Sequence, residues 1–242
     1  MSQTIIIGRG SAPASAAPAG DPYFSSVKLL MGFPGADAST TFTDESSAAH
    51  AMTAVGNAQI DTAQSKFGGS AYLGDGTGDC VTSPDHADWT PAGDFTWELW
   101  VRFNSVAASQ CLISQWSSSP AQRAYEFQWS NSNTLNFLFS TDGSATTTIA
   151  GSWTPSIDTW YFLSVSRVGN DWVTHVDGIV NQTLTNSGAI FDSNQVVRIG
   201  AIFTSSIIQS VNGWVDEVRF TNGVGRYTNV NYTPPTEAFP RS

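Results

Sequence analysis

The 242-residue chain is long enough to bury a hydrophobic core without cross-links, and it has only two cysteines, Cys80 and Cys111. Its 20 acidic and 10 basic residues give a formal net charge of −10, which disfavours nucleic acid and anionic lipid as partners. Charged residues are only 12% of the chain, so Ser, Thr, Asn, Gln and Gly must form most of its surface. This composition favours pleated sheet over helix and predicts an all-β protein.

Residues 1–22 predict an extended N-terminal arm. A short β-prone run, formed by Thr4, Ile5, Ile6 and Ile7, is followed by a tract rich in Ser, Ala and Pro. The apolar run is shorter than the core of a secretory signal, so we expect synthesis in a cytoplasm without membrane insertion. The arm cannot bury enough apolar surface to fold alone. We therefore expect its apolar run to add as a strand to a partner subunit, with docking on its own body as the alternative.

Residues 23–242 predict one body of short strands separated by turn residues, without internal repeats. In chain order, a strand is expected at Val27–Phe33, and one short helix at Glu45–Met52 follows possible caps at Thr43 and Asp44. The clearest strand is Phe95–Phe103, where apolar residues occupy every second position. Similar patterns predict strands at Cys111–Trp116, Tyr125–Trp129, Thr134–Phe139, Trp160–Val168, Trp172–Val176, Val196–Phe203 and Trp214–Phe220. This spacing indicates an antiparallel two-sheet sandwich.

Four stretches resemble, in their order, the signature of laminin-G-like, concanavalin A-like domains. They are Leu73–Val81, Gly93–Phe103, Trp160–Phe162 leading to Val176–Gly178, and Asn212–Phe220. The resemblance covers nearly all of residues 23–240 and implies a jelly-roll sandwich with an extended C-terminal tail. The flanking stretches resemble laminin-G-like proteins encoded by tailed bacteriophages, whose domains sit on virion surfaces; these stretches are Asp21–Val27, Ala63–Ser70 and Arg226–Glu237.

The bacteriophage resemblance implies a non-enzymatic virion structural protein, specifically a capsid decoration or head-fibre protein. The arm would bind a capsid or other virion protein, and the body would lie on the virion surface after synthesis in the bacterial cytoplasm. A tail-associated adhesin for host glycan and a bacterial carbohydrate-binding module are the alternatives. We also expect a homo-oligomer, of which a trimer is one form, with Tyr227–Phe239 crossing the subunit interface or else covering its own sandwich.

Catalysis is not expected, although sandwiches of this class can carry glycosidase sites with two carboxylates on one strand face. No Glu-x-Asp-x-x-Glu string occurs, and Glu98 has no acidic residue two positions away on its strand. His50, His86 and His175 are scattered and form no His-x-x-x-His metal pair. We expect no required cofactor and two reduced thiols in or beside the core, with a disulfide bridge between them as the alternative.

One acidic residue and three tryptophans are the candidate site residues. The resemblance implies that Asp216 helps to hold a structural calcium ion, with hydrogen bonds from Arg219 or loop amides as the alternative. The carbohydrate-binding residues that the sequence suggests are three tryptophans near turn residues, Trp89, Trp116 and Trp153. Their rings could stack on sugar rings, and the alternative is that they anchor loops on the sandwich rim. By contrast, Trp97, Trp160 and Trp214 lie on predicted strands and are assigned to core packing.

Overall fold

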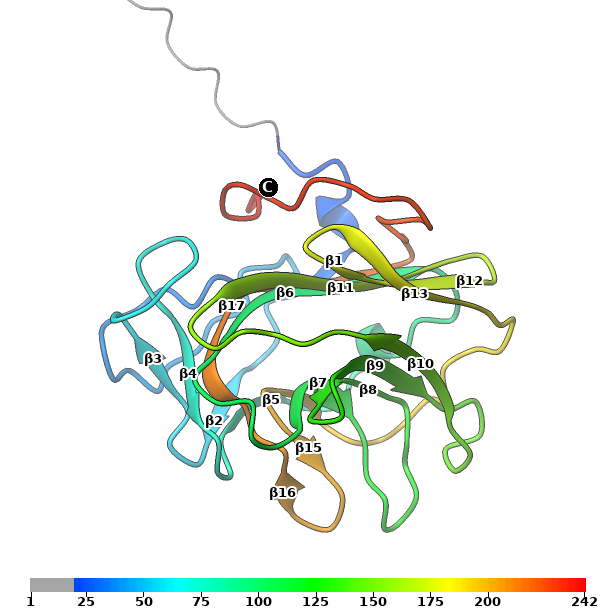
Figure 1. Cartoon of the computed structure of the whole chain (residues 1–242), viewed down its shortest axis with the longest axis horizontal. Coiled ribbons are helices and arrows are strands. Elements are labelled where there is room, and N and C mark those ends of the chain that lie inside the picture. Colours follow the sequence, from blue (N-terminus) through cyan, green and yellow to red (C-terminus); the bar gives the residue numbers. More distant parts are fainter. Residues whose placement is uncertain (1–19) are drawn as a thin grey trace, which may run out of the picture.

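The structure is a computed structural model that describes residues 20–242, in which two antiparallel β-sheets pack face to face (Figure 1). The predicted all-β sandwich is confirmed, and its topology is consistent with a jelly-roll. Thr4, Ile5, Ile6 and Ile7 lie outside the described residues. Within residues 20–242, no helix is long and apolar enough to cross a membrane.

The larger sheet has eight strands. Its spatial order is β13 (Ile179–Thr185), β12 (Asp171–Val176), β11 (Trp160–Val168), β6 (Phe95–Phe103), β17 (Asn212–Asn222), β4 (Ala71–Asp75) and β3 (Gln59–Asp61), and β1 (Val27–Met31) also pairs with β17. The seven-stranded sheet has the order β10 (Thr147–Ser152), β9 (Thr134–Phe139), β8 (Tyr125–Ser130), β7 (Gln110–Gln115), β14 (Val197–Ile199), β5 (Cys80–Ser83) and β2 (Thr53–Val55). The small elements are the hairpin of β15 (Ile202–Phe203) and β16 (Ile207–Ile208) and two 3-10 turns, η1 (Phe24–Ser26) and η2 (Ala87–Trp89).

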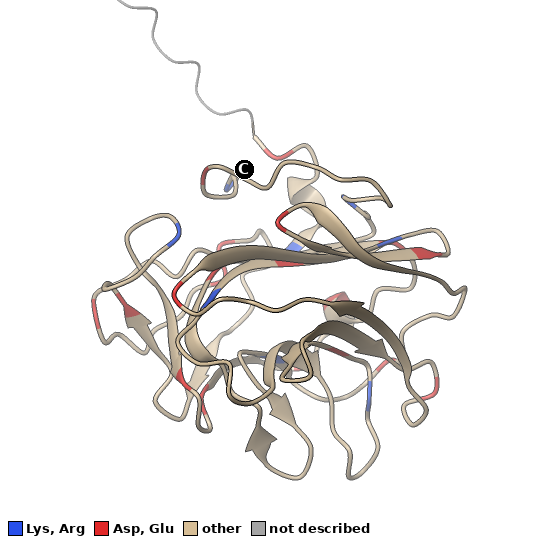
Figure 2. Ribbon diagram, viewed as in Figure 1, with Lys and Arg blue, Asp and Glu red and all other residues tan. Residues whose placement is uncertain are grey.

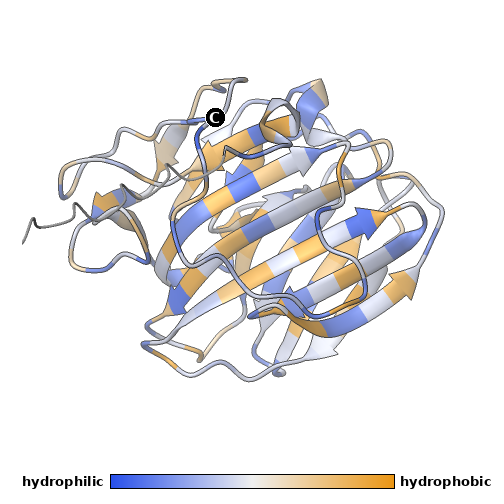
Figure 3. Cartoon of the chain, turned by 90° about the horizontal axis from the view of Figure 1, so that it is seen from above, coloured by the Kyte–Doolittle hydropathy of each residue, from blue (hydrophilic) through white to orange (hydrophobic). Residues whose placement is uncertain are grey.

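An aromatic core fills the space between the sheets. Along β6, every second side chain points into it, and hydrophobic and hydrophilic residues alternate along the strands in Figure 3. Trp97 stacks on Phe220 with ring centroids 4.2 Å apart, and Phe139 stacks on Trp172 at the same distance. Such pairs join the two sheets or neighbouring strands and add about 0.5–1.5 kcal/mol each beyond area burial. Cys80 and Cys111 are free and buried, as expected.

A second apolar layer covers the outer face of the eight-stranded sheet, the face turned away from the seven-stranded sheet. Trp100 and Phe162 project outward from the sheet, and Phe239 from the C-terminal tail packs with them. The tail therefore covers its own sandwich, which was the alternative to a subunit strap, and it runs across the top of the molecule in Figure 1. Trp160 packs in this outer layer and not in the central core, because its position on β11 faces outward.

Buried charges lie beneath this tail, although basic residues are few on the molecule as a whole (Figure 2). Arg219 places Nε 2.7 Å from Glu98 Oε1 and Nη1 2.9 Å from Asp21 Oδ2. Arg226 Nη2 lies 2.6 Å from Asp21 Oδ2, and the Tyr227 hydroxyl donates to Glu98 Oε2 at 2.6 Å. We call these five residues the clamp, because they join the start of the body, two central strands and the tail.

The clamp moves the start of the body earlier than the sequence placed it. Asp21, assigned to the arm, has a side chain only 2% exposed, and its backbone N–H donates to the carbonyl of Ser242 at 2.8 Å. Burial opposes ionisation of this carboxyl, but hydrogen bonds from Arg226 and Tyr23 and the nearby guanidinium charges hold its pKa below the usual value. The two ends of the described chain are thus fastened together.

Two predicted elements are wrong for identifiable reasons. Glu45–Met52 is a loop and not a helix, because the Asp44 carboxylate accepts hydrogen bonds from Leu30, Ser46 and His50 amides and folds the segment around itself. Val196–Phe203 is divided between β14 and β15 at Gly200, whose φ of +93° leaves the extended region. The strands that were not expected from their sequences are β2, β3, β4, β5, β10, β13 and β16.

Replacing Arg219 by Met should destabilise the fold by about 3–5 kcal/mol, because the two buried carboxylates of Asp21 and Glu98 would keep only one of their two guanidinium partners, Arg226. Urea unfolding measures the change. The matched control is Asp158→Asn, which removes the charge of a surface carboxylate paired with Arg102, keeps a residue suited to the φ of +62° at this position, and should cost less than about 1 kcal/mol. Equal costs for the two variants would show that the clamp contributes no more than a surface ion pair.

Candidate functional site

A groove of 410 Å³ opens on the outer face of the eight-stranded sheet, between β11–β13 and the tail. Trp172 points into the core, so its neighbours Asp171 and Val173 point outward into the groove. The strand register pairs Asp171 with Thr185 and Val173 with Thr183, which places all four on the same face. The volume is within the range of small-molecule sites.

Polar and apolar groups alternate in this groove. Val168 and Val230 supply apolar surface, while Asp171, Thr183 and Thr185 supply a carboxylate and two hydroxyls at exposed positions. Thr185 Oγ1 donates to Asp171 Oδ1 at 2.9 Å and so orients the carboxylate. This mixture can bind a ligand that carries hydroxyl groups on an apolar ring, as a sugar does.

The far wall of the groove is the tail turn Thr228–Val230. His175 Nε2 lies 3.2 Å from the Val230 carbonyl oxygen, and burial lowers the pKa of this imidazole in spite of its backbone hydrogen bonds. Tyr227 and Tyr232 flank the turn and stack with centroids 3.9 Å apart. The wall is therefore held by buried contacts, while Val230 itself keeps 62% of its surface exposed.

The three candidate tryptophans lie away from this groove. Trp89 is fully buried, with Nε1 donating to the Pro84 carbonyl at 2.9 Å. Trp116 is 5% exposed and packs beside Cys111 and Ile202. Neither ring offers a face to a sugar, so loop anchoring describes both. Trp153 is half-buried against Tyr161, with centroids 5.1 Å apart, and is the one of the three that keeps an accessible edge.

Asp216 is held by loop amides. Its Oδ2 accepts from the backbone N–H groups of Lys66 at 2.7 Å and Phe67 at 3.0 Å, and its Oδ1 accepts from Glu217 at 2.8 Å. The neighbouring Glu217 carboxylate is taken by Arg241, with Oε1 2.8 Å from Nη2. A calcium ion needs six to eight oxygen ligands, and a single carboxylate saturated by three amides does not fit that requirement. Arg219, the other expected donor, binds Glu98 and Asp21 instead.

Comparison with known proteins agrees with this fold. A family model described as the Concanavalin A-like lectin/glucanases superfamily matches residues 75–226, more than half of the chain. The chain belongs to this superfamily. No curated protein matches it.

Solved structures with a fold similar to that of this chain include the binding domains of toxins. The binding domain of botulinum neurotoxin serotype C1 is 13% identical, with a TM-score of 0.62, and the match covers 82% of this chain and 49% of that one. The binding domain of Paraclostridial Mosquitocidal Protein 1 is 12% identical, with a TM-score of 0.63 and coverage of 82% and 49%. Botulinum neurotoxin type C is a toxin whose cell entry depends on interaction with two ganglioside molecules. A structure of it is 12% identical to this chain, with a TM-score of 0.61, and the match covers 82% of this chain and 48% of that one. The chain thus spans about half the length of these structures.

Glu98 is the strand carboxylate that the sequence offers for a glycosidase-type reaction, which uses two carboxylates. Its side chain is fully buried, and both oxygens are engaged, one by Arg219 and the other by Tyr227. A carboxylate enclosed in this way beneath the tail cannot reach a glycosidic bond. Glu98 therefore has a structural role in the clamp.

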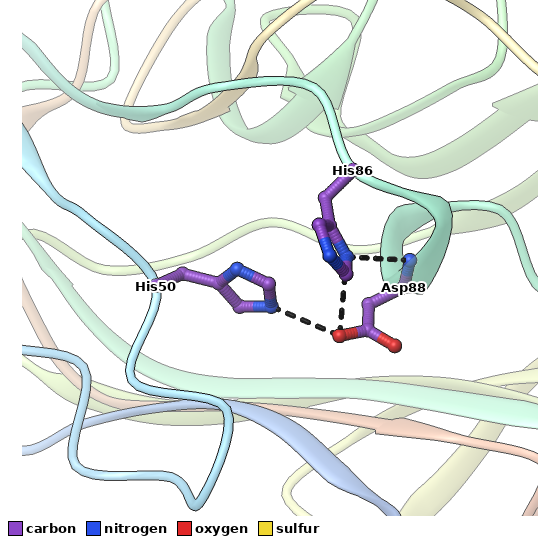
Figure 4. A group of neighbouring side chains, drawn as sticks. All are labelled: His50, His86 and Asp88. Atoms are coloured by element: carbon purple, nitrogen blue, oxygen red, sulfur yellow. Dashed lines mark hydrogen bonds and ion pairs between the residues drawn. The ribbon is translucent and has the colours of Figure 1, made fainter.

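The fold also brings together side chains that sequence reasoning left apart. His50, His86 and Asp88 converge at η2, and each histidine has a ring nitrogen within 3.2 Å of Asp88 Oδ2 (Figure 4). The spacing His86-x-Asp88 was a local signal for this cluster. His50 is 38 residues from Asp88, so only the tertiary structure reveals its proximity.

Asp216→Asn should make the free energy of unfolding less dependent on pH. Burial raises the pKa of Asp216 to about 7 in spite of its three amide donors. Between about pH 4 and pH 7 the unfolded chain has lost a proton that the native state keeps, so wild-type stability falls as pH rises, by up to about 1.4 kcal/mol per unit. Urea unfolding at several pH values compares the two slopes.

Equal slopes in the two proteins would contradict this role of Asp216. A chelator provides the matched test of the calcium hypothesis, because an ion bound only by the native state raises its melting temperature. We expect no change in the wild-type melting temperature with chelator. A decrease in the wild type that is absent from Asp216→Asn would instead support a calcium ligand.

Proposed function

We propose that this chain is a non-enzymatic virion protein of a tailed bacteriophage that displays a glycan-binding sandwich, as a capsid decoration or head-fibre protein. The groove beside the tail is the observation that supports glycan binding. The superfamily membership supports the lectin-like sandwich, and the resemblance of the flanking stretches supports display on a virion. A tail-associated adhesin is the second candidate, and the same groove favours it.

The chemistry of the groove suits a saccharide. Sugar rings present hydroxyl groups at their edges and C–H groups on their faces, so they are bound by polar side chains next to apolar ones. Asp171 and Asn229 offer a carboxylate and an amide, and Val168 and Val230 offer apolar surface in the groove. Hydrogen bonds to a charged group contribute about 1.5–3 kcal/mol each, so the carboxylate is the main anchor in this proposal.

Attachment through the arm is consistent with the position of the chain ends. Gly20 and Asp21 lie beside Ser242, on the outer face of the eight-stranded sheet (Figure 1). A partner that binds the arm would therefore approach this outer face beside Asp21 and Ser242 and leave the seven-stranded sheet free, while the groove beside Thr228–Val230 opens on the same face. In this proposal, Thr4–Ile7 adds as an edge strand to a capsid or other virion protein.

Self-association belongs to the same proposal. Because the tail packs on its own sandwich, a homo-oligomer such as a trimer would use another surface. Ile157 and Ile179 are 49% and 55% exposed and are candidate contacts for it.

Asp171→Ala and Asn229→Ala should each weaken glycan binding by about tenfold or more, which corresponds to about 1.4 kcal/mol. Both positions are exposed, so the fold should remain within about 0.5 kcal/mol of wild type. A glycan array followed by calorimetry with the best-bound saccharide measures the effect. Trp153→Ala is the matched control, and loss of binding there with retention in Asp171→Ala would move the site to the Trp153 rim.

Deletion of residues 1–19 should leave a folded sandwich that no longer joins the particle, because the clamp begins at Asp21. Melting of the isolated protein and mass spectrometry of purified particles measure the two properties. Normal incorporation of the deleted chain would refute attachment through the arm.

Labelling of wild-type particles in negative stain distinguishes a position on the head from a position on the tail. Many copies on the head support decoration, and a few copies at the tail support the adhesin.

A further inference from the structure

The cluster of His50, His86 and Asp88 has the geometry of a metal site. His50 Nε2 lies 3.1 Å from Asp88 Oδ2, and His86 Nδ1 lies 3.2 Å from the same oxygen. Ligand atoms about 2.0–2.1 Å from a tetrahedral zinc ion are separated by about 3.3 Å. One donor atom from each residue lies within 4.8 Å of the other two, so small side-chain movements bring all three to that spacing.

Two of the three side chains are already held in place by the folded body. The backbone N–H of His50 donates to Asp44 Oδ2 at 2.8 Å, and the His50 ring packs on Trp89 with centroids 4.4 Å apart. The backbone carbonyl of Asp88 accepts from Asn222 Nδ2 at 2.9 Å, which fixes η2 to the end of β17. An ion would therefore meet partly preorganised ligands and would lose little binding energy to ordering them.

The cluster is open on one side. The side chains of His50 and Asp88 are 11% and 22% exposed, whereas that of His86 is 54% exposed. Lys28 Nζ lies 3.7 Å from Asp88 Oδ1 and leaves Oδ2 to face the two imidazoles. An ion can thus enter from solvent and keep a water molecule as its fourth ligand.

We propose that His50, His86 and Asp88 bind a divalent transition-metal ion of the zinc type. Two imidazoles and one carboxylate suit zinc, whereas calcium and magnesium prefer oxygen ligands alone. His86 Nδ1 accepts a hydrogen bond from the Asp88 N–H at 3.1 Å, so metal binding replaces this bond or uses the other ring nitrogen after a ring flip. The ion joins the loop that contains His50 to η2. This metal site is separate from the groove proposed to bind glycan.

Titration of the untagged, full-length protein with zinc chloride tests the proposal directly. Calorimetry should show one ion bound per chain, and zinc should raise the melting temperature because the three ligands come together only in the native state. His86→Ala should weaken zinc binding by at least about tenfold and remove the thermal shift. Absence of saturable zinc binding by the wild type would overturn the proposal.

Asp85→Asn is the matched control, since Asp85 lies one residue before His86 but binds Gln115 and is not in the cluster. It should bind zinc as the wild type does. His50→Gln provides a second ligand variant, and Co²⁺ provides a spectroscopic readout through the visible absorption of tetrahedral, nitrogen-bound cobalt. Zinc affinity in His86→Ala and His50→Gln equal to that of Asp85→Asn would overturn the assignment of these ligands.

Discussion

The ion pairs between Arg219 and the carboxylates of Glu98 and Asp21 are the constraint on which the arrangement of this protein depends. Buried charges are tolerated only when they are paired, and removing one partner leaves the other without compensation in a poorly solvating interior. Glu98 and Arg219 lie on the central strands β6 and β17, whereas Asp21 precedes the first strand. Folding of the central strands therefore fixes the start of the body.

The clamp also determines where the tail lies. Arg226 and Tyr227 add the tail to the buried pairs, and Tyr232 stacks on Tyr227. Their positions define the turn that forms the outer wall of the groove. A sandwich without this tail would present a flat outer sheet, so the concave site depends on the contact between distant parts of the chain. Superfamily membership accounts for the sheets, and the tail accounts for the site.

Strands were predictable where apolar residues occupy every second position in the sequence. The bounds of Phe95–Phe103, Thr134–Phe139 and Trp160–Val168 follow from the alternation of apolar side chains, which is strongest in the middle of a sheet. The edge strand Ile179–Thr185 was missed, because it pairs with a neighbouring strand along one edge only and its residues are mostly polar and exposed. The loop at Glu45–Met52 was mistaken for a helix, since local propensity gives no sign of the contacts made by Asp44.

The candidate site was less predictable than the fold. Alternation identifies which residues of a strand share a face of the sheet, but it does not show which face lies in the central core and which lies under the tail. Trp160 was assigned to the wrong layer for this reason. Turn residues next to Trp89 suggested exposure, yet the loop folds its ring into the body. The groove joins β11–β13 to Thr228–Val230, and such long-range contacts are not visible in a single sequence.

A crystal structure with a saccharide identified on a glycan array tests the central claim most directly, namely that the clamped tail builds a glycan site on the outer sheet. The account predicts a sugar ring in contact with Val168 and Val230, with a hydroxyl group bonded to the Asp171 carboxylate. A saccharide bound beside Trp153, with the groove filled only by water, would contradict it.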